Sequence, residues 1–320
     1  MSDDLLREKF GLKDRDGWKL STARDKFRQE RNWYEKIRSY SYRPFDYRWV
    51  YHSNILMDRP RGELLKHISS SNIAIATTLQ LSSPPFNHAF VTDMLPDNQL
   101  LSVKTKDRAY FFPLYSIEKG YKKLNINQQI VQKIEELIKK EIDPLMIMCY
   151  IYAILNSRIY RTTYESSLSL QFPRIPFTNR KEYFIKLAEY GRELINLHLL
   201  REFPFETITT YPVSGSNYVK IVYYNQDKKR IYINEEQYFS GIVKEIWDYI
   251  IGAFQVFQKW LQDKIDLQLA SDDVDKFQRM VSAITQTAII QNKIDELFEL
   301  AIGENLFIGK SHKNQKLHTY

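Results

Sequence analysis

The sequence predicts an α+β fold, in which a basic part of mixed helices and strands is followed by a helix-rich part with one β-hairpin. Hydrophobic residues make up 43% of the 320 residues, including 22 Tyr and 18 Phe, which excludes a wholly disordered chain. Strand-like runs gather in the first half, and helical periodicity dominates the second. Residues 1–180 hold 29 Lys and Arg against 20 Asp and Glu, whereas residues 181–320 hold 17 against 19. We therefore expect the first half to face a polyanion and the second half to support it.

The first half divides into a connector and a basic α/β part. Residues 1–41 are predicted to be a helical connector, because apolar side chains from Trp18 to Ile37 can share one helical face. Residues 42–178 form the α/β part, which opens with an aromatic run interrupted by Pro44. Further patterns predict a short helix at 61–67, buried strands at 72–81, 89–92 and 109–115, an amphipathic helix at 130–142, and another helix that starts at Pro144.

Residues 179–320 are predicted to be the helix-rich supporting part. Asn179 and Glu182 resemble a capping box for a helix that runs to residue 200. A hairpin is expected near 219–234. Two long helices follow, at 242–264, with Ile246 and Ile250 buried, and at 272–300, with Ser271 as its cap.

The motifs of common catalytic sites are missing from the sequence. No two of the ten glycines form a GxG pair, so neither a dinucleotide-binding loop nor a phosphate-binding P-loop is present. The six histidines form no HExxH pattern, and the single cysteine, Cys149, excludes an intrachain disulfide and argues against structural zinc. Ser83-Pro84-Pro85-Phe86 resembles the short motif of amino-methyltransferases, but no glycine-bearing cofactor loop precedes it. A proline loop between two strands is the favoured interpretation.

The hydropathy pattern predicts a cytoplasmic protein. The longest apolar run, residues 145–155, is shorter than the roughly 20 residues that a membrane span needs. The first residues lack the basic and apolar regions of a signal peptide. We expect no membrane contact and a monomer.

Several long runs resemble the C-terminal specificity region of type ISP restriction-modification enzymes, which are relatives of the single-chain type IIG enzymes. The longest are YRPFDYRWVYHSNILMDRPRGELLKHI at 42–68 and YIYAILNSRIYRTTYESSLSLQFPRIPF at 150–177. Shorter ones follow in the family's order at 191–200, 230–239 and 251–264. The chain departs from the family at Ala253 and Phe254, where Gly-Tyr is more usual, and at Gln171, where an acid is more usual.

The resemblance implies a module that recognises an asymmetric sequence in double-stranded DNA. In the family, a nuclease, a motor and an adenine methyltransferase precede this region, and the methyltransferase flips the target adenine out of the duplex. S-adenosylmethionine, ATP and Mg²⁺ are therefore expected only in those other domains, and no cofactor or metal is expected in this chain. The chain is not expected to be an enzyme on its own. Its partners would be duplex DNA and a methyltransferase domain of the same or a companion chain.

The candidate DNA-contacting residues fall into two groups. Stretches that match the family poorly supply the base-reading candidates, of which the loop at 102–108 is preferred: Gln80, Asn87, Lys104, Lys106 and Arg108. Basic residues of the matching runs supply the phosphate-contacting candidates: Arg59, Arg61, Lys66, Arg158 and Arg161. Lys122 and Lys123 are a second choice, after the loop at 102–108, for reading bases. Arg43 and Arg48 are expected to stack on aromatic rings or to pair with Asp46 instead.

Two alternative functions stay open. The neutral C-terminal helices could make the chain a docking scaffold for a separate methyltransferase or motor subunit. A small adenine methyltransferase that uses Ser83–Phe86 is the less favoured alternative, because no cofactor loop is present.

Overall fold

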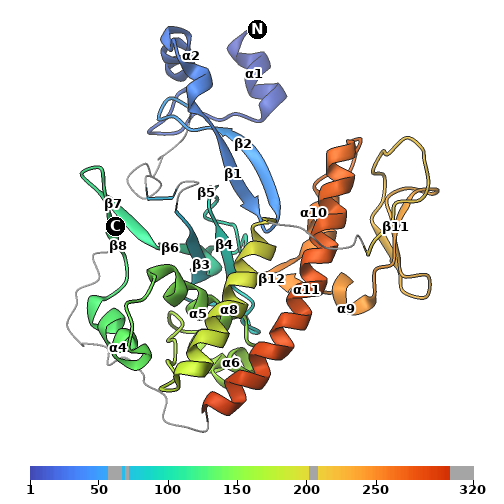
Figure 1. The fold of residues 1–320 in the computed structure, drawn as a ribbon. Helices are drawn as coiled ribbons and strands as arrows, with labels where there is room; N and C mark the ends of the chain where they lie inside the picture. The colour runs from blue at the N-terminus through green and yellow to red at the C-terminus, as the bar shows by residue number, and fades with distance from the viewer. Residues whose placement is uncertain (57–66, 69–71, 202–207, 303–320) are drawn as a thin grey trace.

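The computed structural model describes residues 1–56, 67–68, 72–201 and 208–302, and it confirms the predicted α+β class (Figure 1). The sequence prediction of a short helix at 61–67 lies almost entirely outside the described residues. None of the helices in these ranges is long and apolar enough to cross a membrane.

The N-terminal region is a strand ribbon with two short helices, and the prediction of a helical connector up to residue 41 is wrong in part. Helices α1 (Asp3–Phe10) and α2 (Leu20–Gln29) precede a 3₁₀ turn, and strand β1 (Ile37–Arg43) then pairs antiparallel with β2 (Asp46–Tyr51). Ile37, predicted to lie on the apolar face of the helix, is instead opposite Tyr51 in the ribbon. The ribbon projects from the body and carries α1 and α2 at its far end (Figure 1).

The central sheet has the strand order β4-β3-β6, and all three strands confirm predictions. Their bounds are Ala74–Thr78 for β3, Ala89–Thr92 for β4 and Ala109–Pro113 for β6. Strand β3 is buried along its length, including Thr77 and Thr78 at its end, as expected of a central strand that is covered on both faces. A short strand β5 (Leu95–Pro96) joins β1, and β7 (Tyr115–Glu118) and β8 (Tyr121–Leu124) form a separate hairpin beyond β6.

Helices cover one face of this sheet. They are α4 (Gln128–Ile138), α5 (Pro144–Asn156), α6 (Arg158–Thr163), α7 (Glu165–Leu168) and α8 (Lys181–His198). Helix α5 begins as predicted at Pro144, where Asp143 accepts a hydrogen bond from the main-chain N–H of Leu145 at 2.9 Å. The predicted capping box of α8 is absent, because its N-cap residue is Arg180 and makes no side-chain cap.

The C-terminal part departs from prediction in one place. The hairpin near 219–234 is confirmed as β9 (Tyr223–Asn225) and β10 (Arg230–Tyr232), to which β11 (Tyr238–Ser240) adds a third strand. The long helix predicted at 242–264 is wrong. This segment forms α9 (Lys244–Trp247), the short hairpin β12 (Ile250–Ile251) and β13 (Phe254–Gln255), and α10 (Val256–Gln262). The last helix, α11 (Ser271–Ile302), confirms the predicted helix, with Ser271 as its first residue instead of its cap.

The turn at Gly252 is the reason why the helix at 242–264 does not form. Gly252 has φ +63°, and its N–H donates to the carbonyl of Asn87 at 2.7 Å. The next N–H, of Ala253, donates to the carbonyl of Leu101, also at 2.7 Å. The hairpin β12–β13 is therefore docked by its backbone onto the loops that flank β4, and a continuous helix would have no N–H groups free for these bonds.

We expect Gly252→Ala to lower the free energy of unfolding by about 2–4 kcal/mol, because it combines left-handed strain with overpacking. A Cβ at this position would be 2.0 Å from the main-chain oxygen of Leu101, which belongs to a buried backbone that cannot move aside cheaply. Urea unfolding measures the effect. Gly17→Ala is the matched control, because a Cβ there meets nothing within 4 Å, and equal stabilities of the two variants would contradict this account.

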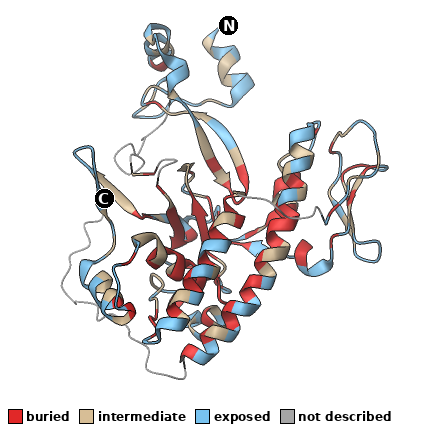
Figure 2. Cartoon of the chain, viewed as in Figure 1, coloured by how far each residue is buried: buried red, intermediate tan, exposed pale blue. Residues whose placement is uncertain are grey.

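Among the described residues, the buried side chains form two clusters, one on each face of the sheet. Figure 2 shows the buried residues concentrated on the central sheet and the helices beside it. The first packs α5, α8 and the end of α11 against Ile75, and includes Cys149. Burial raises the pKa of the Cys149 thiol to about 11, as expected for an inert core cysteine. The second packs α10, α11 and the β9–β11 sheet against Ala76. The division of the chain at residue 178 stays a prediction, although the first cluster contains residues from both sides of it.

Candidate nucleic-acid interface

The register of the central sheet brings two predicted DNA-contacting loops together. Thr78 at the end of β3 is opposite Ala109 at the start of β6, and Thr77 is opposite Ala89 at the start of β4. The loop after β3 (79–88) and the loop before β6 (97–108) therefore lie at the same end of the strands. We call this end of the sheet, with its two loops, the loop end.

A buried carboxylate joins the two loops. Asp107 is 2% exposed and accepts hydrogen bonds from the main-chain N–H of Ser82 at 2.5 Å and from its hydroxyl at 2.7 Å. The hydroxyl of Ser102 donates to the other carboxylate oxygen at 3.3 Å. In addition, the N–H of Lys104 donates to the Ser102 hydroxyl at 3.1 Å. These hydrogen bonds hold the backbone of 102–108 on its buried side, so the position of the loop does not depend on the loop's exposed side chains.

The same loop exposes three cationic side chains. Lys104, Lys106 and Arg108 are all exposed, and none forms an ion pair with an acid in the described part of the chain. Gln80 is exposed on the neighbouring loop, where its carbonyl accepts from the Thr78 hydroxyl at 2.9 Å. The structure thus places four of the five base-reading candidates at the loop end, with side chains that solvent can reach. Their contact with DNA stays a prediction.

Asn87 and Arg161 are engaged inside the protein. The guanidinium of Arg161 donates to the Leu155 carbonyl at 2.7 Å, to the Asn156 side chain at 3.1 Å and to the Asn87 side chain at 3.4 Å. Burial lowers the pKa of Arg161. Together with the bond from Gly252 to Asn87, these contacts give both residues a role in holding α6 and β12 to the loop end, and DNA contact by either one stays a prediction.

Of the remaining phosphate-contacting candidates, Arg158 is the one that lies within the described residues. The half-exposed Arg158 pairs with Asp295 of α11 at 2.9 Å and also donates to Asn292. Arg59, Arg61 and Lys66 lie outside the described residues, and their contact with phosphate stays a prediction. The second-choice lysines, 122 and 123, lie on β8, beyond the opposite end of β6, so they are not part of the loop end.

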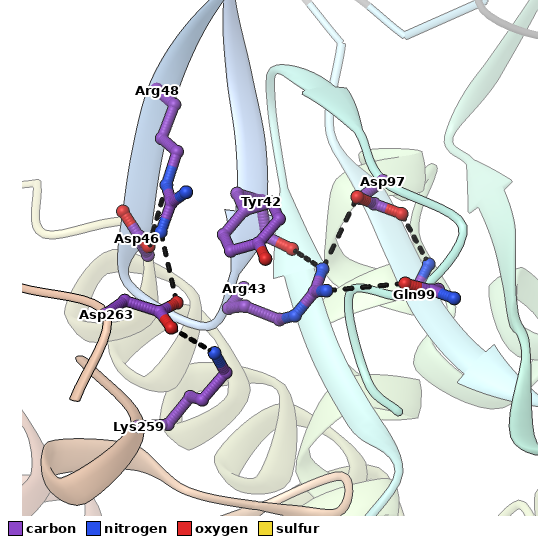
Figure 3. Close-up of polar contacts among 8 residues, drawn as sticks. All are labelled: Tyr42, Arg43, Asp46, Arg48, Asp97, Gln99, Lys259 and Asp263. Carbon is purple, nitrogen blue, oxygen red and sulfur yellow. Dashed lines mark hydrogen bonds and ion pairs between the residues drawn. The ribbon is translucent and has the colours of Figure 1, made fainter. Parts of the chain in front are cut away.

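Arg43 and Arg48 confirm the expectation of structural roles (Figure 3). Both guanidinium groups stack on the ring of Tyr42, at 3.8 and 3.7 Å from its centroid. Arg43 is 4% exposed and pairs with Asp97 at 3.4 Å. Arg48 bonds to Asp46 at 2.7 Å and reaches Asp263, beyond the end of α10, at 3.1 Å. The cluster fastens the N-terminal ribbon to the body and leaves these two arginines little freedom for DNA.

Two features of the loop end escaped the sequence analysis. Asp107 lies in the basic run 102–108, and nothing in the spacing of that run indicates that its carboxylate is buried. His88, next to the candidate Asn87, is 3% exposed, and neither ring nitrogen has a hydrogen-bond partner in the described residues. Burial, helped by Arg161 and Lys104 and opposed by Asp107, lowers the pKa of His88 to about 4. The sequence signals that could have suggested these positions are weak, because both need the tertiary fold.

A second buried histidine, His198, is held in a defined neutral form. The Thr287 hydroxyl donates to the Ala283 carbonyl at 2.8 Å, so it can only accept from Nε2–H of His198 at 3.1 Å. Nδ1 then accepts a hydrogen bond from the hydroxyl of Tyr152. Burial, with a contribution from Arg161, lowers the pKa of His198 to about 3.

These two histidines predict acid sensitivity. Both histidines have a folded-state pKa below the unfolded value of about 6.5. The unfolded chain therefore binds protons more readily than the folded protein as the pH falls below about 6.5, and this difference lowers the free energy of unfolding. By pH 5 each is expected to lower the free energy of unfolding by about 2 kcal/mol. Urea unfolding between pH 7.5 and 5 tests this, and His88→Leu should remove about half of the effect. An identical pH dependence for the variant and the parent would contradict the assignment to His88.

Comparisons with known proteins agree with this architecture. A model of the type ISP C-terminal specificity domain matches residues 1–299. No protein of curated function matches the sequence significantly. Among solved structures, the DrdV–DNA complex is 22% identical, with a TM-score of 0.65, and the match covers 83% of this chain and 28% of DrdV.

Two further structures share the fold. A nuclease-deletion mutant of the type ISP restriction-modification enzyme LlaGI, in complex with a DNA substrate mimic, is 19% identical with a TM-score of 0.61 and matches 86% of this chain. The ATP-dependent type ISP enzyme LlaBIII, bound to DNA, is 19% identical with a TM-score of 0.65 and matches 91%. The chain spans only 20–28% of the length of the three proteins. Since the family model matches nearly the whole sequence, the chain belongs to the type ISP C-terminal specificity domain family.

Proposed function

We propose that this chain recognises a sequence in double-stranded DNA and holds the duplex for adenine methylation and cleavage by other domains of a restriction-modification enzyme. One observation carries the proposal: Lys104, Lys106 and Arg108 are exposed without acidic partners in the described residues, on a loop anchored by the buried Asp107. A rigid loop with mobile cationic tips can bond to guanine edges and phosphates while its own backbone keeps the register. The DNA-bound states of the three similar structures support it.

The proposal assigns the chemistry to a methyltransferase domain that this chain would contact as a monomer. S-adenosylmethionine, ATP and Mg²⁺ would bind in such other domains. The Ser83–Phe86 segment forms a loop between β3 and β4, as expected of the proline-loop interpretation. Calorimetry with S-adenosylmethionine tests the alternative that this chain is itself a methyltransferase, and we expect no heat of binding.

The test is selection from a pool of random-sequence duplexes at two salt concentrations, followed by sequencing of the retained DNA. We expect one asymmetric motif to be enriched, with retention that falls steeply as salt rises because phosphate contacts release counterions. Retention without enrichment would show phosphate binding only and would contradict recognition by this chain alone. Absence of retention would favour the docking scaffold.

A further inference from the structure

An apolar pocket of about 330 Å³ lies beside the edge strand β6, on the sheet face that α5 covers. Its walls come from β3, β6, α5, the link between β8 and α4, and the segment after α7, which are far apart in the sequence. Six of its apolar lining residues are Ile75, Phe112, Met148, Ile151, Leu155 and Phe172. Protein interiors are close-packed, so an open apolar cavity of this size marks a binding site more often than a packing fault.

A hydroxyl in the pocket wall lacks a partner. Thr77 lines the pocket and is 4% exposed, and its Oγ1 has no hydrogen bond within the described residues. A buried hydroxyl without a partner destabilises a fold, and valine would fill the same space without that cost. Asn125, another lining residue, donates its amide N–H to the Pro113 carbonyl at 2.9 Å. The hydroxyl of Thr77 is thus a polar group that a ligand could satisfy, in an otherwise apolar wall.

Aromatic rings lead from the basic loop to this pocket. Tyr110 and Phe112 alternate along β6 on the pocket face, and they are 44% and 42% exposed. Phe172 packs edge-on against both, with ring centroids at 5.1 and 5.4 Å. Tyr110 follows Arg108 by two residues, so the first ring begins about 7 Å along the strand from the cationic loop. A chain with phosphates near Arg108 could place a base on these rings.

We propose that the pocket takes an unpaired nucleobase of the DNA held at the loop end, an inference that rests on the proposed function. A nucleobase is flat, stacks on aromatic side chains and carries both donors and acceptors at its edge. The Thr77 hydroxyl can serve as either partner, so it fits such an edge whichever group faces it. The adjoining cations distinguish this ligand class from an uncharged aromatic molecule, since they would hold the phosphates on either side of the base.

The test uses the full chain and three duplexes of one sequence: fully paired, with one unpaired 2-aminopurine, and with an unpaired abasic residue. We expect the duplex with the unpaired base to bind about ten-fold more tightly than the abasic one, the gain typical of one stacked base, with a change in 2-aminopurine fluorescence on binding. Phe172→Ala and Thr77→Val should remove this preference while leaving affinity for the abasic duplex unchanged. Thr77→Val replaces the hydroxyl by a methyl group of similar size and is expected to fold at least as stably as the parent.

Leu170→Ala is the matched control, because Leu170 is 73% exposed near Phe172 but does not line the pocket, and it should keep the preference. Equal affinity for the base-containing and abasic duplexes would overturn the pocket assignment and leave the proposed function intact. A preference for the unpaired base that survives in both Phe172→Ala and Thr77→Val would also overturn the pocket assignment, because the base would then bind elsewhere. Failure to bind any of the three duplexes would overturn the proposed function and this inference with it.

Discussion

Replacing Lys104, Lys106 and Arg108 together by alanine is expected to lower affinity for the selected duplex by at least about 100-fold, since each direct contact is worth about 1–3 kcal/mol. The loop itself should keep its shape, because Asp107 and the two serines that bond to it are unchanged. If all three cations contact phosphates, the slope of log affinity against log salt should fall by about 3. If they read bases instead, sequence selectivity should disappear with a smaller change in slope. Fluorescence anisotropy over a salt series distinguishes the two results.

The control for this variant removes the same charge elsewhere. Lys181, Lys220 and Lys228 are exposed and lie away from the loop end, on α8 and around the β9–β10 hairpin. Their replacement by alanine should change affinity by less than about three-fold, as expected of a long-range charge effect that salt screens. Unchanged selectivity in the Lys104, Lys106 and Arg108 variant would contradict the choice of this loop.

Arg43→Ala is expected to have the largest effect on stability, lowering the free energy of unfolding by about 3–5 kcal/mol because it removes one partner of a buried ion pair. Asp97 would lose its guanidinium, and Tyr42 would lose one of its two stacked arginines. The ring of Phe254, 5.4 Å from the same guanidinium, would also lose a contact. Chemical unfolding followed by tryptophan fluorescence measures the change.

Arg38→Ala is the control on the same strand. Arg38 is exposed, and the structure gives it no ion pair among the described residues, so its removal should change stability by less than about 0.5 kcal/mol. A stability of Arg43→Ala equal to that of Arg38→Ala would mean that the cluster around Tyr42 does not fasten the ribbon to the body.

Local patterns predicted the central sheet well, because each strand carries its own signal. Residues 89–92 and 109–113 form strands where alternation and aromatic content place them. The segment 242–264 failed for the opposite reason. Its apolar spacing fits a helix, but the backbone bonds from Gly252 and Ala253 to loops more than 140 residues away decide its structure, and periodicity carries no information about such distant partners.

The sequence predicted which cationic residues the candidate site contains, but not the hydrogen bonds that hold its loop in place. The exposed cations of 102–108 are visible as a basic polar run between strands. The bond from Ser82 to Asp107, which makes the loop rigid, joins residues that only the sheet register brings together. Likewise, nothing in the sequence distinguishes Arg161 from the other basic residues of the runs that match the family. Its hydrogen bonds to Leu155, Asn156 and Asn87 depend on how the helices pack beside the loop before β4.

The central claim is that the loop end lies on the DNA, and one measurement tests it most directly. Cys149 is buried and inert, so a Thr105→Cys variant has a single reactive thiol, on the exposed part of the loop, to which an iron chelate that cleaves nearby DNA can be attached. We predict cleavage centred within the motif enriched from random duplexes, and none from the same chelate on a Lys228→Cys variant. Cleavage absent at Thr105→Cys while the duplex remains bound, or present only at Lys228→Cys, would contradict the account.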